Sequence, residues 1–322
     1  MKAVFPDFST VSRGDIDLGP LEAAGIDLAL YGVTTAAELP ARLAAAEILI
    51  TNKIRIGEAE LAAARLLKLI CLSATGVNNV DLEAAQARGI GVCNITAYCT
   101  ASVVQHVYAM ILALTHHLSG YQRVLQQGAW KTSPQFCLLD YPIRELSGRT
   151  LGIVGYGELG RGVARVAPAF GLEVLVSERP GGPGASTPAA EARVPFERLL
   201  EEADILSLHC PLTDATRGLI DARALGRMKR DALLINTARG ALVDSAALAA
   251  ALRAQRIGGA GIDVLPQEPP VDGDPLLDAA IPNLIITPHV AWAARESRQR
   301  AIDEIAANIR SFLAGGRRGR VI

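Results

Sequence analysis

The chain has 322 residues, of which 50% are hydrophobic and 20% are charged, and its formal net charge is −1. This length exceeds one ordinary hydrophobic core and favours two domains of roughly 100–200 residues each. The balanced charge argues against a protein that binds nucleic acid or an anionic membrane, because both partners need a basic surface.

The cysteines are few and scattered. They form no CxxC pair and show no spacing with histidine that resembles a metal cage, so we expect reduced thiols and no bound metal. The first residues lack the apolar segment and cleavage site of a secretory signal, and no run approaches about 18 uninterrupted apolar residues. These features predict a cytoplasmic protein that is neither secreted nor membrane-spanning. The cysteines are Cys71, Cys93, Cys99, Cys137 and Cys210.

Two series of short apolar runs predict strands that alternate with helices. The first series lies at 3–5, 28–30, 48–50, 67–72 and 90–94, with alanine-rich stretches at 59–65 and 82–88. The second lies at 151–154, 173–176, 205–208, 232–235, 260–262 and 284–286. Such alternation predicts parallel βαβ units, and therefore two α/β domains.

The segments outside these series are of several kinds. Apolar residues recur every three to four positions in 100–118, which predicts a long helix leaving the first domain, and again in 295–313, whose periodicity does not say which domain it packs on. Residues 119–148 lack periodicity and are expected to wander across a surface, and 179–188 are rich in proline and glycine and should form a loop. Three histidines of the long helix are expected to pack in a core or an interface: His106, His116 and His117.

A glycine-rich motif opens the second domain. The run Gly155-Tyr156-Gly157-Glu158-Leu159-Gly160 directly follows a predicted strand and begins a predicted helix. Glycines at this spacing permit a tight turn and a close approach of a pyrophosphate to backbone amides, where the helix N-terminus supplies partial positive charge. The motif predicts a dinucleotide site, and a purely structural glycine turn is the alternative.

An acidic residue at the end of the next strand indicates which dinucleotide binds. Glu178 lies 18 positions beyond Gly160. Its carboxylate can accept hydrogen bonds from both ribose hydroxyls and would repel a 2′-phosphate, which favours NAD over NADP. The adjacent Arg179 could answer a phosphate, so NADP remains possible.

Four polar residues lie just beyond predicted strands of the second domain. Arg239 follows 232–235, Asp263 and Glu268 follow 260–262, and His289 follows 284–286. The ends of parallel strands meet along one edge of a sheet, beside the dinucleotide, so these side chains could form one site. Taken singly, each residue has a structural alternative. Arg239 could form a surface ion pair, Asp263 could cap a turn, and Glu268 could simply be solvated. His289 could be a packed histidine.

The ordered motifs resemble the D-isomer-specific 2-hydroxyacid dehydrogenases over nearly the whole chain. Within that family the chain is most similar to glycerate dehydrogenases, also called hydroxypyruvate reductases, although Gln105 stands where many relatives have glutamate. The motifs that carry the resemblance are Ser73–Asp81, Val103-Val104-Gln105-His106, Gly148–Gly160, Pro211-Leu212-Thr213, Ile235–Gly240, Gly261–Val264 with Glu268-Pro269, and Pro288–Trp292.

The resemblance implies a division of catalytic roles. Arg239 would hold the substrate carboxylate and polarise its keto group, because a guanidinium can engage two oxygens at once. His289 would donate a proton during reduction and accept one during oxidation, and Glu268 would orient the imidazole and stabilise its charged form. Related formate dehydrogenases carry glutamine at this last position, so Glu268 argues against formate as the substrate.

The resemblance also implies binding residues. The substrate would contact Thr75, Gly76 and Val77, together with Arg239, His289 and Trp292. The dinucleotide would be lined by Val104, Gly155, Gly157, Glu158, Leu159, Gly160, Glu178, Cys210, Pro211, Thr216, Thr237, Ala238, Arg239, Asp263 and His289.

The implied architecture is α/β, with two Rossmann-like or flavodoxin-like parallel-sheet domains and an interdomain cleft. Residues 1–98 plus 292–322 would form a discontinuous substrate domain, and 99–291 the NAD-binding domain. The long helix and residues 119–148 resemble the family's dimer contacts, which predicts a homodimer.

The implied reaction is the NAD-dependent interconversion of hydroxypyruvate and D-glycerate. An alternative within the family is a reductase of glyoxylate or another 2-keto acid. An alternative from another class is an NAD-sensing corepressor-like protein, since some relatives of this fold keep similar site residues; a pure sensor would bind NADH without turnover.

Overall fold

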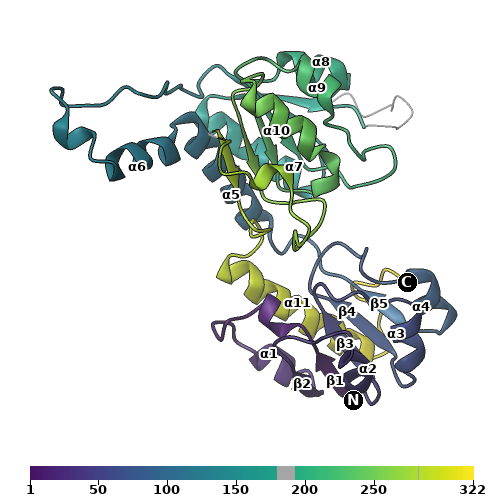
Figure 1. The fold of residues 1–322 in the computed structure, drawn as a ribbon. Helices are drawn as coiled ribbons and strands as arrows, with labels where there is room; N and C mark the ends of the chain where they lie inside the picture. The colour runs from purple at the N-terminus through teal and green to yellow at the C-terminus, as the bar shows by residue number, and fades with distance from the viewer. Residues whose placement is uncertain (180–192, 282) are drawn as a thin grey trace. The chain divides into compact units, whose positions relative to one another are not determined.

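A computed structural model describes residues 1–179, 193–281 and 283–322, so most of the loop expected at 179–188 lies outside the described residues. The chain forms two compact units (Figure 1). Unit 1 comprises Met1–Cys99 and Trp292–Ile322, and unit 2 comprises Thr100–Ala291.

Unit 1 is built on a parallel sheet with the strand order β2-β1-β3-β4-β5. Alternate strand residues enter two different cores, because successive side chains of a strand point to opposite faces. Ala3 and Phe5 pack with α1 and α11, whereas Val4 packs with α2, α3 and α4, so helices cover both faces. The elements are β1 (Lys2–Phe5), η1 (Phe8–Thr10), α1 (Gly19–Glu22), β2 (Asp27–Leu30), α2 (Leu39–Leu43), β3 (Ile48–Thr51), α3 (Glu58–Ala63), β4 (Leu69–Leu72), α4 (Leu82–Ala87), β5 (Gly91–Cys93) and α11 (Arg295–Leu313).

The C-terminal helix α11 belongs to unit 1. Its periodic residues Ile302, Ile305 and Ile309 are fully buried in the core that also contains Phe5. The first and last parts of the chain therefore share one core. None of the helices in the described ranges is both long and apolar enough to cross a bilayer.

Unit 2 is built on a second parallel sheet, with the strand order β12-β11-β10-β9-β6-β7-β8. Helices α8, α9 and α10 cover one face, and α5 and α7 contact strands of the sheet as well. The elements are α5 (Thr100–Thr115), α6 (Leu118–Gln126), η2 (Trp130–Thr132), β6 (Thr150–Val154), α7 (Glu158–Val166), η3 (Ala167–Phe170), β7 (Glu173–Ser177), β8 (Arg193–Val194), α8 (Phe196–Glu202), β9 (Ile205–Leu208), α9 (Ala222–Arg227), β10 (Leu233–Asn236), η4 (Gly240–Leu242), α10 (Ser245–Arg253), β11 (Gly259–Ile262), η5 (Pro275–Leu277) and β12 (Leu284–Ile286).

The strand order of unit 2 reverses between β6 and β9. From β6 the chain proceeds outward through β7 and β8, and it then returns to β9 on the other side of β6. In open α/β sheets, ligands bind beyond the carboxyl ends of the strands at such a reversal. The fold thus marks the carboxyl edge of this sheet as the place for a dinucleotide.

Two expectations for residues 100–148 were wrong in detail. The long helix ends at Thr115 rather than Leu118, because His117 has a φ of 50°, which an α-helix does not tolerate. The next segment, expected to be irregular, begins with helix α6 and contains the short helix η2. Figure 1 shows α6 and the chain after it lying away from the sheet of unit 2. We call residues 118–143 the arm.

Candidate active site

The residues expected to carry the chemistry follow strands at the carboxyl edge of the unit 2 sheet. Gly155 follows β6, Arg239 lies beyond β10, Asp263 directly follows β11, and His289 lies beyond β12. These strands are parallel, so their carboxyl ends lie on the same edge. The sheet topology thereby brings these residues to one side of unit 2.

The glycine motif has no room for a side chain at two positions. Gly155 has a φ of 93°, and a Cβ atom there would lie 2.4 Å from the backbone nitrogen of Cys210. A Cβ on Gly160 would lie 2.1 Å from the carbonyl oxygen of Gly155. Side chains at either position would separate the loop after β6 from β9 or from helix α7, so the glycines are needed for close packing at the reversal.

The surroundings of this motif fit a dinucleotide. Helix α7 begins at Glu158 directly after Gly157, so its N-terminal amides lie at the edge where a pyrophosphate would bind. Glu178 is exposed at the end of β7. The Thr237 hydroxyl is buried and has no hydrogen-bond partner among the described residues. A buried, unpaired hydroxyl is unfavourable unless a ligand forms a hydrogen bond with it. The residues around the motif therefore fit a bound dinucleotide.

Other predicted lining residues already serve the protein's own structure. The Thr216 hydroxyl donates to the Pro211 carbonyl at 2.8 Å and accepts from the Thr213 amide at 2.8 Å, which closes the turn after β9. Burial raises the pKa of the Cys210 thiol to about 11, so this side chain is a neutral, apolar wall near pH 7. Val104 is buried on α5, facing Gly162 of α7. Leu159 and Ala238 are half-buried.

Arg239 is exposed on a loop that a buried amide side chain fixes. The Asn236 side chain accepts from the Ala238 amide at 3.0 Å and donates to the Arg239 carbonyl at 2.9 Å. A Cβ atom on Gly240 would lie 2.0 Å from the backbone of Leu265. The Arg239 loop is therefore packed against the loop that carries Glu268. Sequence reasoning missed Asn236, whose only signal is a polar residue at the end of an apolar strand.

His289 and Glu268 are brought together as expected. The Nδ1 atom of the imidazole lies 2.6 Å from Oε2 of Glu268, and the side chains are 25% and 35% exposed, so both are partly shielded from water. Oε1 of the same carboxylate accepts from the Leu265 amide at 2.9 Å. The carboxylate is thus fixed by its own loop and in turn orients the imidazole, an arrangement suited to proton transfer.

Asp263 contacts the backbone of the loop that carries His289. Its carboxylate is buried and accepts hydrogen bonds from the amides of Val290 and Ala291, both at 2.9 Å. Its backbone carbonyl accepts from the His289 amide at 2.7 Å. The predicted contact of Asp263 with the nicotinamide stays a prediction, and the contacts within unit 2 give this residue a structural role.

Unit 1 contains the residues predicted to bind the substrate carboxylate. The Thr75 side chain donates to the Ile95 carbonyl at 2.8 Å, and the Thr75 carbonyl accepts from Asn94 at 2.8 Å, so the turn after β4 is fixed. The amides of Thr75, Gly76 and Val77 meet no hydrogen-bond acceptor within the described part of the chain. Trp292 is half-buried against the core of unit 1.

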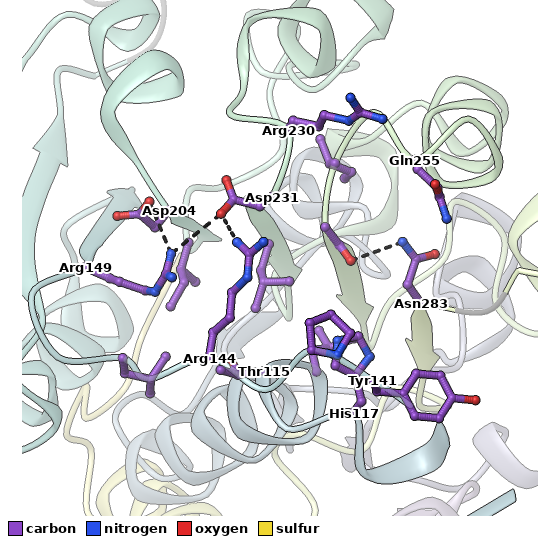
Figure 2. Close-up of a pocket in the computed structure, with 17 residues that line it drawn as sticks. Thr115, His117, Tyr141, Arg144, Arg149, Asp204, Arg230, Asp231, Gln255 and Asn283 are labelled. Atoms are coloured by element: carbon purple, nitrogen blue, oxygen red, sulfur yellow. Dashed lines mark hydrogen bonds and ion pairs between the residues drawn. The ribbon is translucent and has the colours of Figure 1, made fainter. Parts of the chain in front are cut away.

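A large cavity lies at the opposite edge of the unit 2 sheet. It measures about 700 Å³ and is lined by residues at the amino ends of strands, such as Arg149, Ile205 and Leu233. Figure 2 shows Arg149 paired with Asp204 and Asp231, and Arg144 paired with Asp231, whereas Tyr141 and His117 line another part of the cavity. None of the predicted site residues lines this cavity, so it is separate from the candidate active site.

Comparisons with known proteins found similar sequences. Residues 108–291 match the model of the D-isomer specific 2-hydroxyacid dehydrogenase, NAD binding domain. The chain is 45% identical over 281 residues to a glycerate dehydrogenase from Methylorubrum extorquens, covering 87% of both proteins. It is 35% identical over 318 residues to a hydroxypyruvate reductase from Blautia hydrogenotrophica, covering 98% of both.

Solved structures resemble the entire fold. The TT0316 protein from Thermus thermophilus has a TM-score of 0.88 at 36% identity, with 100% of both chains covered. The D-lactate dehydrogenase from Aquifex aeolicus, solved in complex with NAD and lactic acid, has a TM-score of 0.82 at 28% identity, with 97% of this chain and 96% of that chain covered.

Proposed function

Because the chain belongs to the D-isomer-specific 2-hydroxyacid dehydrogenase family, we propose that it interconverts hydroxypyruvate and D-glycerate with NAD(H). The enzyme is an NAD-dependent oxidoreductase of 2-hydroxy acids. The observation that carries the proposal is the pair His289 and Glu268, whose 2.6 Å contact forms an oriented proton donor at the edge expected to hold the cofactor.

The roles of the side chains follow from the reaction. The bound dinucleotide supplies a hydride to the carbonyl carbon in reduction and accepts it in oxidation. Arg239 binds the substrate carboxylate and polarises the keto oxygen with its planar guanidinium. His289 donates a proton to the oxygen as negative charge develops there, and Glu268 holds the imidazole in place and stabilises its charged form.

The substrate carboxylate needs further donors. We assign this role to the amides of Thr75, Gly76 and Val77, because consecutive backbone amides without internal acceptors form a site for an anion. Trp292 would contact the remainder of the substrate. The hydroxymethyl group of hydroxypyruvate is suggested by the names of the relatives, among them glycerate dehydrogenase and hydroxypyruvate reductase.

A second candidate substrate is glyoxylate. A glyoxylate reductase from Korarchaeum cryptofilum is 38% identical over 254 residues, covering 79% of this chain and 75% of that protein. The carboxylate and keto group are common to both substrates, so Arg239 and His289 would serve either one. Specificity constants for a panel of 2-keto acids, measured with NADH and NADPH, decide between them.

The working enzyme is proposed to be a homodimer in the cytoplasm. Large apolar side chains are exposed along the arm, including Phe136 at 90% and Leu139 at 80%. Apolar surface of this extent is typical of a protein interface, and a second copy of the chain would cover it. The free thiols of all the cysteines suit a reducing compartment.

The decisive experiment for this function is the substitution His289→Gln. We expect the turnover number for hydroxypyruvate reduction to fall about 100- to 10,000-fold, because the proton donor is lost. The dissociation constant of NADH, measured by fluorescence titration, should stay nearly constant. Near-full turnover in this variant would refute the mechanism, and NADH binding by the unmodified protein without turnover on any 2-keto acid would favour a sensor.

A further inference from the structure

His289 has a strained backbone that its surroundings must hold. Its φ is 55°, in the left-handed region that a side chain with a Cβ atom seldom adopts. Such a conformation persists only where the neighbouring contacts fix it. The direction of the imidazole therefore depends on whatever holds residues 287–291, which we call the histidine loop.

Asp263 holds the histidine loop through hydrogen bonds to its backbone amides. Its backbone carbonyl accepts from the His289 amide, and its two carboxylate oxygens accept from the amides of Val290 and Ala291. The carboxylate is fully buried, so these bonds do not compete with water. Asp263 consequently fixes three successive amides: its backbone holds that of His289, and its side chain holds those of Val290 and Ala291.

Thr287 and His106 complete a chain of hydrogen bonds to this carboxylate. The Thr287 hydroxyl donates to Oδ1 of Asp263 at 2.5 Å. A hydroxyl has one proton, so the same oxygen must accept in its contact with Nε2 of His106, at 3.0 Å. Nε2 of His106 therefore carries a proton and lies 3.6 Å from Oδ1 of Asp263. The sequence suggested only packing for His106, since it gives no sign of this contact.

Helix α5 thus holds the histidine loop at both ends. The Ser102 hydroxyl donates to the Ala291 carbonyl at 2.6 Å, and His106 donates to Thr287 at the other end. Residues four apart lie on the same face of a helix, so one face of α5 presents both groups to the loop. A rigid helix is a better support for a precise site than another loop would be.

We infer that His106 is a positioning residue for proton transfer, acting on His289 through Thr287 and Asp263. The inference rests on the proposed function of His289 and adds a donor on α5 that no substrate or cofactor needs to touch. Without the N–H donor of His106, the Thr287 hydroxyl would be less firmly held, and the Asp263 carboxylate that it contacts could rotate. The imidazole of His289 would then spend less time in the reactive direction.

The test compares two substitutions of His106 in the full-length enzyme. His106→Leu keeps a similar volume but removes the donor, and we expect the turnover number to fall about 10-fold, because a small misplacement of a reacting group is costly. His106→Gln keeps an N–H donor and should recover most of the lost turnover. The KM for the keto acid and the NADH dissociation constant should change less than twofold. The matched control is His116→Leu, at the exposed residue directly after the same helix, and it should leave turnover unchanged.

Two further variants separate positioning from a merely structural role. Thr287→Val should lower turnover like His106→Leu, whereas Thr287→Ser, which keeps the hydroxyl, should not. In the His289→Gln background, adding His106→Leu should cause no further loss of the residual rate, measured at high enzyme concentration. Unchanged turnover in both His106→Leu and Thr287→Val, or an equal further loss in the His289→Gln background, would overturn the inference. The proposed function would stand in either case if His289→Gln alone abolished turnover.

Discussion

The Glu268 carboxylate bridges its own loop and the imidazole of His289. One oxygen accepts from the Leu265 amide at 2.9 Å, and the other lies 2.6 Å from Nδ1 of His289. A carboxylate held in this way cannot rotate freely, so the ring it contacts has one preferred orientation. The relationship joins the loops after β11 and β12, which are adjacent strands of the sheet.

The substitution Glu268→Gln tests the electrostatic half of this relationship. The amide can still accept from Leu265, so the loop should keep its geometry, but the negative charge beside Nδ1 of His289 is lost. We expect turnover to fall about 100-fold, within the range typical of acid–base catalysis. Steady-state kinetics and NADH titration provide the measurement. A turnover within twofold of the unmodified enzyme would show that the charge is unimportant.

Arg239→Lys tests the carboxylate clamp. A lysine keeps the positive charge but replaces the planar fork by a single ammonium, so two oxygens can no longer be held together. We expect the KM for the keto acid to rise about 10- to 100-fold with little change in NADH affinity. Arg230→Lys, at the cavity on the amino edge of the same sheet, is the matched control. Equal kinetics for the two variants would remove Arg239 from the substrate site.

The fold could be predicted because its strands are short apolar runs and its buried helices are periodic. The helix of the arm could not be predicted. The apolar residues of α6, such as Leu118 and Leu125, are exposed, so their spacing does not mark a face that packs on the chain's own core. The edge strand β8 has only two residues and too little pattern to detect. His117 ends α5 through a backbone conformation that the identity of the residue does not encode.

The residues of the candidate site could also be predicted only in part. His289 and Glu268 could be paired from the family motifs, because the reaction itself demands a proton donor with an acidic partner. The residues that support them could not be found this way. Asn236 and Thr287 each act through two side-chain hydrogen bonds, and the partners of such bonds are set by how the loops pack rather than by spacing in the sequence.

Exposed apolar residues on the arm lead to a prediction about assembly. The double substitution Phe136→Asp with Leu139→Asp places charges where we expect a second copy to bind. Light scattering should give twice the chain mass of 33.9 kDa for the unmodified protein and the single mass for the variant. Val271→Asp, also exposed in unit 2 but outside the arm, should leave the mass unchanged. A single mass for the unmodified protein would exclude the homodimer.

Glu178 leads to a prediction about the choice of cofactor. The enzyme should use NADH in preference to NADPH, because an exposed carboxylate at the end of β7 would repel the 2′-phosphate. Removing the charge by Glu178→Gln should lower the ratio of the two specificity constants about 10-fold, which equals roughly 1.4 kcal/mol. Glu173→Gln, at the amino end of the same strand, is the control. A preference for NADPH in the unmodified enzyme would assign the decisive contact to Arg179 instead.

His209 leads to a prediction about stability and pH. Burial lowers the pKa of its imidazole from 6.5 to about 4, so the folded protein keeps this ring neutral. Between these two values the unfolded chain binds a proton that the folded chain excludes, and the free energy of unfolding therefore decreases as the pH falls. The contribution of neutral His209 to the free energy of unfolding is present above pH 6.5. About 2 kcal/mol of this contribution should be lost between pH 7.5 and pH 5.

Urea unfolding of the enzyme and of His209→Gln, at fixed protein concentration, isolates this contribution. Other groups titrate in both proteins, so the difference between their unfolding free energies reports on His209 alone. The glutamine can retain a contact with Ser207, whose hydroxyl lies 2.8 Å from Nε2 of His209, but it has no proton to gain. The stability advantage of the histidine protein should shrink by about 2 kcal/mol over this pH range. Parallel pH profiles would mean that the ring is hydrated or paired in solution, and that its burial does not keep it neutral.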